Sequence, residues 1–165
     1  MKKINKVYVL VASMVLMFSM KSNAQISKAE IRATGLTCSM CSNAINKQLK
    51  SLPEVVNVET DLNTNTFTVT LKEGNELSPK VFKEKVEKAG FFIGSLVVTA
   101  KPETITKSTY ILVNDKPNNV TEIQFQVVDK GYVTEKEFKK LSKSYKNVET
   151  YAANNEDDFH IKILN

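Results

Sequence analysis

The two cysteines of this 165-residue chain, Cys38 and Cys41, form a Cys-x-x-Cys motif. Three kinds of chemistry suit this spacing: a structural disulfide, a redox-active dithiol, and a pair of thiolates that holds a metal ion. A disulfide across so short a loop stabilises little, because its effect on the unfolded chain grows with loop length. A redox dithiol is favoured where a helix N-terminus stabilises the thiolate. The spacing alone leaves the redox and metal hypotheses open.

Other soft ligands are scarce in the sequence. Beyond residue 24 the chain contains one methionine, Met40, and its only histidine is His160. His160 alternates with Phe159 and Ile161, so we expect it on the outer face of a strand and not at a metal site. Structural zinc normally requires four ligands, whereas two thiolates suit soft ions. A metal site here therefore favours Cu(I), Ag(I) or Hg(II).

Residues 1–24 have the layout of a secretory signal peptide. Lysines near the start precede an uncharged run over residues 7–20, and small side chains at Ser22 and Ala24 predict cleavage after Ala24. An uncleaved anchor is the alternative, but a spanning helix needs about 20 apolar residues. We therefore expect a mature chain that begins at Gln25, has no membrane span and is periplasmic or secreted.

The leader also explains most of the positive charge. It contains four of the 23 basic residues and no acidic residue, which leaves 19 basic and 18 acidic residues in the mature chain. A balance this close to neutral gives no general attraction to nucleic acid or anionic membranes. The remaining 141 residues suit one ordinary domain or two small ones.

Hydrophobic periodicity predicts an alternation of strands and helices over residues 25–100. Four segments are typical of strands, and apolar residues recur at helical spacing in two others. The predicted order is strand 29–34, helix 41–52, strands 56–58 and 67–71, helix 78–89 and strand 91–100. This order predicts an α+β fold, the ferredoxin-like βαββαβ open-faced sandwich, with both helices on one face of an antiparallel sheet.

A second small α+β unit is predicted over residues 101–165, after a boundary at residues 101–103. Thr134 and Glu137 form a capping box that opens a helix. Strands are expected at residues 110–113, 123–128, 148–152 and 159–164. The helix should bury Phe138, Leu141 and Tyr145, and its lysines should form a solvated face, with docking of an acidic partner as the alternative. Those lysines are Lys136, Lys139, Lys140, Lys143 and Lys146.

Residues 122–164 also echo residues 30–71. Similar short stretches recur after 90 to 92 residues, as in Asn-Val-Glu-Thr at 57–60 and again at 147–150. The echo suggests a partial repeat without cysteines, in which the strand at 110–113 lies beside the strand at 123–128. Chance similarity between two small α+β segments is the alternative.

The sequence around the cysteines resembles the heavy-metal-associated (HMA) domain family. Residues 35–45 read GLTCSMCSNAI, LPEV follows at 52–55, and KAGF at 88–91 precedes the last predicted strand. The resemblance covers residues 27–100. The family comprises copper chaperones, the N-terminal modules of copper-transporting P-type ATPases and the periplasmic mercury-binding protein.

The resemblance implies a role for each residue of the motif. Cys38 and Cys41 would bind the metal, with Leu36, Thr37 and Phe91 supporting the loop. Leu36 stands where the family often has methionine, an apolar exchange of similar volume. Met40, between the ligands, is expected to face solvent.

The sequence therefore predicts an exported carrier or buffer of Cu(I), with Hg(II) or Ag(I) as alternative cargo, and not an enzyme. Its partner would be a protein that donates or accepts the metal, such as a copper transporter. The alternatives are a periplasmic thiol-disulfide oxidoreductase and a non-catalytic adaptor. In an oxidising compartment the two cysteines could also rest as a disulfide.

Overall fold

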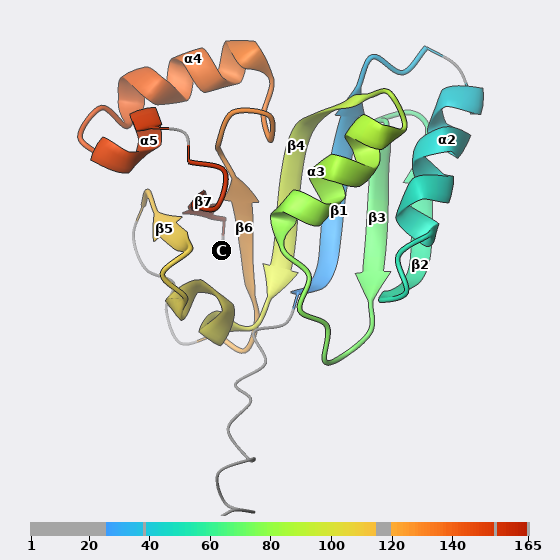
Figure 1. Cartoon of the computed structure of the whole chain (residues 1–165), viewed down its shortest axis with the longest axis horizontal. Helices are drawn as coiled ribbons and strands as arrows, with labels where there is room; N and C mark the ends of the chain where they lie inside the picture. Colours follow the sequence, from blue (N-terminus) through green and yellow to red (C-terminus); the bar gives the residue numbers. More distant parts are fainter. Residues whose placement is uncertain (1–25, 38, 115–119, 154, 165) are drawn as a thin grey trace, which may run out of the picture.

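A computed structural model describes residues 26–37, 39–114, 120–153 and 155–164. Within these residues seven strands form one sheet, in the order β2-β3-β1-β4-β6-β7-β5 (Figure 1). The first part of the chain supplies β1 (Ile26–Thr34), α2 (Ser39–Lys50), β2 (Val55–Asp61), β3 (Thr66–Leu71), α3 (Pro79–Lys88) and β4 (Phe92–Ala100). This order confirms the predicted βαββαβ arrangement.

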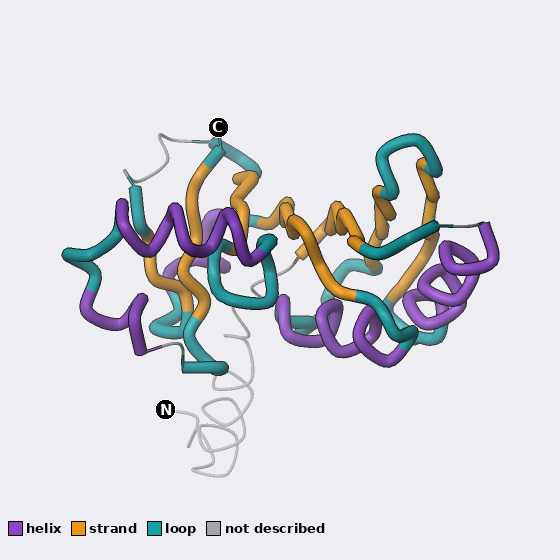
Figure 2. Tube along the Cα trace, turned by 90° about the horizontal axis from the view of Figure 1, so that it is seen from above, coloured by secondary structure: helices purple, strands orange, loops and turns teal. Residues whose placement is uncertain are grey.

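The first four strands pair in an antiparallel manner, with β1 between β3 and β4. Ile31 of β1 lies opposite Phe67 of β3 and Leu96 of β4, and all three side chains are fully buried. Because strand side chains alternate between faces, this register turns one apolar row of each strand to the same side. Helices α2 and α3 cover that side (Figure 2). The predicted open-faced sandwich is therefore confirmed.

Helix α3 starts and ends where the sequence predicted. Ser78 is the N-cap residue, although its side chain makes no capping hydrogen bond, and Pro79 occupies the first helical position. Gly90 follows the helix with a φ of +88°, a conformation that glycine adopts without strain. Phe82 and Val86 are fully buried on the sheet side of the helix.

The second part of the chain continues the same sheet. It comprises the 3₁₀ helix η1 (Pro102–Thr106), β5 (Tyr110–Leu112), β6 (Ile123–Val127), α4 (Glu135–Ser144), α5 (Glu149–Ala153) and β7 (Phe159–Ile163). Strand β6 is antiparallel to β4 over five residue pairs, from Leu96 and Val127 to Ala100 and Ile123. The buried residues of both parts belong to one hydrophobic cluster. Whether the part before residue 101 is a separate folding unit stays a prediction.

Two predictions for the second part are wrong. Residues 149–153 form helix α5 and not a strand, because Val148 and Tyr151 share one helical face and Ala152 and Ala153 favour helix. Strand β5 pairs in parallel with β7 and not with β6, whose other edge is taken by β4. The segment that echoes β2 is helical, so the suggested partial repeat does not extend to this element, and the repeat itself stays a prediction.

The aromatic core of the second part centres on Tyr151 of α5. Its ring packs against Phe138 and Tyr145, and its hydroxyl donates to the Val128 carbonyl oxygen at 2.6 Å. The expected burial of Phe138, Leu141 and Tyr145 is only partly met, because each is half-buried. Helix α4 lies beside α5, near one end of the sheet (Figure 1). The Thr134 hydroxyl accepts from the Glu137 N–H, as the capping box predicted.

Every helix in the described residues is too short or too polar to cross a bilayer.

A chain truncated after Ala100 tests how far the two parts depend on each other. The first part should fold and bind metal, because Ile31, Phe67 and Phe82 are buried between its own helices and strands. Removal of β6 exposes the hydrogen-bonding edge of β4, and an exposed edge pairs with other chains. We therefore expect concentration-dependent association in analytical ultracentrifugation.

The control is the same truncated chain with Val97→Lys. Val97 lies on β4 with its side chain on the face opposite Leu96 and Val98, and a lysine near an edge opposes pairing. This variant should stay monomeric. A truncated chain that is unfolded at all concentrations would show that the two parts need a common core.

Candidate metal-binding site

The loop between β1 and α2 carries the cysteine motif. Strand β1 ends at Thr34, Gly35 turns the chain with a φ of +83°, and α2 begins at Ser39. Cys38 lies outside the described residues. Cys41 lies in the first turn of α2 and is half-buried. The free N–H groups of a helix N-terminus interact favourably with an anionic sulfur, so this position suits a thiolate ligand.

The predicted supporting residues lie in and beside this loop. Leu36 is half-buried and packs against the core, whereas Thr37 is exposed. Phe91 also packs against the core, and its Cδ1 lies 4.0 Å from the position that a Cβ on Gly35 would occupy. The Phe91 N–H donates to the Val86 carbonyl oxygen at 3.2 Å, which fixes its backbone at the end of α3. The loop is therefore anchored on one side and open to solvent on the other.

Two exposed apolar side chains lie next to the loop. Met40 is 81% exposed, as expected for a residue between the ligands, and Phe92 is 69% exposed. Phe92 pairs with Thr34 at the end of β1, and its carbonyl oxygen accepts from the Thr34 hydroxyl. Single exposed apolar side chains are common on protein surfaces and mark a contact site only where they form a contiguous patch. Met40 lies beside Cys41 in the first turn of α2, and Phe92 lies beside the last residue of β1.

Gly94 is a structural residue of the site that sequence reasoning missed. The register of β1 and β4 shifts between Arg32 and Ala33, and Gly94 is the extra residue on β4. A Cβ on Gly94 would lie 2.6 Å from the Thr34 methyl group and 3.6 Å from that of Thr134. The available signal was a glycine inside a strand pattern, which suggests a bulge or a close approach. The bulge brings the start of α4 close to the start of the metal loop.

The prediction that His160 lies on the outer face of the sheet is wrong. Its side chain is 1% exposed, because α5 covers the face of β7 from which it projects and the Tyr151 ring packs on it edge-on. Its Nδ1 lies 2.7 Å from Asp129 Oδ1 and its Nε2 lies 2.8 Å from Thr150 Oγ1. Both ring nitrogens of His160 are thus engaged by protein side chains.

Asp129 completes this buried polar group. Its Oδ2 also accepts from the His160 backbone N–H at 2.6 Å. Burial raises the pKa of the Asp129 carboxyl above its ordinary value, and the hydrogen bonds and charge of His160 oppose that rise. Buried polar groups are tolerated when their hydrogen bonds are made. The hydrogen bonds among Asp129, His160 and Thr150 therefore join β7 to the segment after β6 and to α5. These residues are distant in sequence from the cysteine motif.

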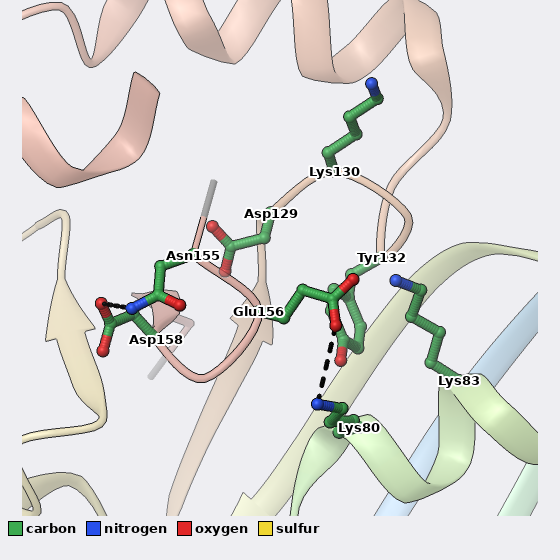
Figure 3. A pocket seen from close by; sticks show the side chains of 8 residues that line it. All are labelled: Lys80, Lys83, Asp129, Lys130, Tyr132, Asn155, Glu156 and Asp158. Carbon is green, nitrogen blue, oxygen red and sulfur yellow. Dashed lines mark hydrogen bonds and ion pairs between the residues drawn. The ribbon is translucent and has the colours of Figure 1, made fainter. Parts of the chain in front are cut away.

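A small cavity lies between α3 and the second part of the chain (Figure 3). Lys80 pairs with Glu156 and Asp157 across it, and the Lys83 ammonium lies 5.5 Å from the centre of the Tyr132 ring. Its volume of about 40 Å³ suits one or two water molecules and no organic ligand. Among the described residues no group of three or more histidine, cysteine, aspartate or glutamate side chains could hold a metal ion.

Comparison with known proteins identifies the first part of the chain. Residues 30–92 match the family model of the heavy-metal-associated domain. A stretch of 57 residues is 42% identical to a copper-transporting ATPase of Saccharomyces cerevisiae. That stretch is 34% of this chain and 6% of the ATPase, so the chain spans only a small share of this relative.

Solved structures of copper-transport domains align with about two fifths of the chain. The yeast copper transporter domain Ccc2a is 38% identical and aligns with a TM-score of 0.36, covering 39% of this chain and 86% of that one. The N-terminal domain of a potential copper-translocating P-type ATPase from Bacillus subtilis is 34% identical, also at 0.36, covering 41% and 82%.

The contact between Gly94 and Thr34 can be tested by a rescue experiment. Gly94→Ala places a methyl group against the Thr34 methyl group, and we expect a loss of about 1–3 kcal/mol in the free energy of unfolding. Thr34→Ser removes that methyl group and keeps the hydroxyl that donates to Phe92. The double variant should regain most of the loss in urea unfolding. An equal loss with and without the Thr34 methyl group would contradict this contact.

Proposed function

Because residues 30–92 belong to the heavy-metal-associated domain family, we propose that this chain binds Cu(I) through Cys38 and Cys41 and passes it to a partner protein. One observation carries the proposal: Cys41 lies in the first turn of α2, directly after β1, inside the matched segment. The copper-transporting ATPase relative supports copper as the cargo.

The chemistry of the ligands favours a soft metal ion that two sulfurs can hold. The chain has two cysteines, and both ring nitrogens of its single histidine are engaged by Asp129 and Thr150. Two thiolates satisfy Cu(I), whereas zinc in a structural site takes four ligands. Ag(I) and Hg(II) suit the same pair of sulfurs and are the alternative cargo.

Transfer would proceed by exchange of thiolates. An ion held by two sulfurs on an exposed loop leaves room for a third sulfur from an incoming partner. A new Cu–S bond can then form before an old one breaks, so the ion is never released into solution. The exposure of Thr37 and Met40 leaves the approach to this loop open. In this scheme the chain acts as a carrier or buffer and catalyses no reaction.

The sheet argues against the alternative of a thiol-disulfide oxidoreductase. A thioredoxin-type strand order would be expected for that function, whereas β1 is antiparallel to both of its neighbours and belongs to a ferredoxin-like sheet. An adaptor without metal chemistry would share this fold, so metal affinity decides between the adaptor and the carrier.

The ligand set is tested by an anaerobic Cu(I) titration of the reduced chain against a strong competing chelator. We expect one ion per chain. Cys38→Ser or Cys41→Ser should weaken binding by at least about a thousandfold, or roughly 4 kcal/mol. Met40→Leu is the matched control, because Met40 is exposed between the cysteines and should leave the affinity unchanged. Undiminished affinity in the variant without cysteines would contradict the proposal.

We also propose that the chain is exported and that its leader is removed after Ala24. The uncharged run over residues 7–20 and the small residues before the cut support this proposal. Mass spectrometry of the exported protein should give Gln25 as the first residue. Ala24→Arg, which removes the small residue at the cut, should leave the leader attached, whereas Ala24→Ser should be processed. An intact wild-type leader in the membrane fraction would favour an anchor.

A further inference from the structure

Helix α4 presents a row of lysines to solvent. Lys136, Lys139, Lys140 and Lys143 are all exposed, and among the described residues none of them has a hydrogen bond or ion pair. A shallow depression lies along this face, lined by Glu135 and the same four lysines. These four lysines are called the α4 lysine face below.

The spacing of these lysines disfavours the helix itself. Lys136 and Lys140 are four residues apart, as are Lys139 and Lys143, and two further pairs are three apart. Like charges at these spacings are neighbours on a helix and destabilise it by about 0.2–0.5 kcal/mol per pair. Two favourable spacings, Glu135 with Lys139 and Glu137 with Lys140, offset only part of this repulsion. A face that only had to be soluble would gain from mixed charges, so this one suits an external acidic surface.

The opposite side of α4 makes the helix's own contacts. Phe138 and Tyr145 pack against Tyr151 of α5, which places the apolar side chains on the inner side. No apolar side chain of α4 is exposed. Helices that lie in a membrane surface combine basic residues with an apolar face that enters the lipid. The α4 lysine face therefore favours a protein partner over a lipid surface.

The position of α4 connects this face with the metal site. Thr134, the N-cap residue of α4, and Thr34, the last residue of β1, both contact the space beside Gly94. The start of α4 and the loop from β1 to α2 thus lie at the same end of the sheet (Figure 1). A helix of 10 residues extends about 15 Å from that point. A protein that brings a thiolate to the loop would also cover part of α4.

We propose that the α4 lysine face docks an acidic surface on the protein that exchanges metal with Cys38 and Cys41. This inference rests on the proposed function and adds the chemistry of the partner. Attraction between opposite charges acts mainly on the rate of encounter and is weakened by salt. The face would therefore speed transfer to acidic acceptors and leave the affinity for the ion unchanged.

The experiment measures Cu(I) transfer from the loaded chain to synthetic peptides by stopped flow. One peptide carries a Cys-x-x-Cys motif flanked by glutamates, and the other has glutamines in their place. At low salt the wild-type chain should transfer about tenfold faster to the acidic peptide, and the difference should shrink in roughly 0.5 M salt. Replacing the four lysines of the α4 lysine face by glutamine should abolish this preference, and replacing them by arginine should keep it.

A matched control removes the same charge elsewhere. It carries glutamine at four exposed lysines outside α4, namely Lys50, Lys101, Lys107 and Lys162. This control should keep most of the preference for the acidic peptide. An equal loss in both glutamine variants, or none in the α4 variant, would overturn the inference.

Two further outcomes would also overturn it. Binding to phosphatidylserine vesicles through the same lysines, without any preference among the peptides, would replace the protein partner by a membrane. Failure of the wild-type chain to bind Cu(I) would remove the proposed function and this inference with it. Chelator competition measures the Cu(I) affinity of the wild-type chain and of each variant. If every affinity is normal and the preference for the acidic peptide is absent, the docking inference fails while the proposed function stands.

Discussion

Strand β1 is the element on which the site depends. It is hydrogen-bonded along both edges, to β3 and β4, and its inner residues Ala29 and Ile31 are fully buried. A strand held in this way cannot slip by one residue without turning its apolar side chains to solvent. The loop that leaves Thr34 therefore starts from a fixed point. Gly35 and the first turn of α2 then bring Cys41 to the end of the sheet.

The pairing of β4 with β6 makes the two outer edges of the ferredoxin-like sheet different. One edge strand, β2, has its outer edge free in the described residues, whereas β4 is covered by the second part of the chain. The loop after β6 lies alongside α3, where the Lys83 ammonium approaches the Tyr132 ring. Lys80 of α3 pairs with Glu156, which lies between α5 and β7. The start of α4, which carries the lysine face, also lies beside the loop between β1 and α2, although the two segments are distant in sequence. This position follows from the pairing of β4 with β6.

The sequence predicted the first part of the fold well because its segments alternate cleanly and face either one helix layer or solvent. The second part was harder, since short elements there are covered on both sides. His160 follows a correct strand alternation, yet α5 covers the face that alternation assigned to solvent. Residues 149–153 resemble a strand by analogy with residues 57–60, but the packing of Tyr151 requires a helix.

Sequence reasoning also found the local features of the candidate site and missed those that depend on distant pairing. The spacing of the cysteines and the glycine before them could be read from the sequence. The approach of Thr134 to Gly94 depends on a pairing between strands on either side of residue 101, which no local pattern records.

The place of β7 in the sheet has a consequence for the order of assembly. It lies between β6 and β5, although it follows both of them in the chain. Its parallel ladder with β5 joins residues 49 apart, such as Tyr110 and Phe159. Contacts of this separation form late, because closing a long loop costs entropy before any pairing is gained. β5 and the edge of β6 that faces it therefore have no strand partner until residues 159–163 have left the ribosome. The sheet of a chain with this topology therefore stays incomplete until almost the whole sequence is available for pairing.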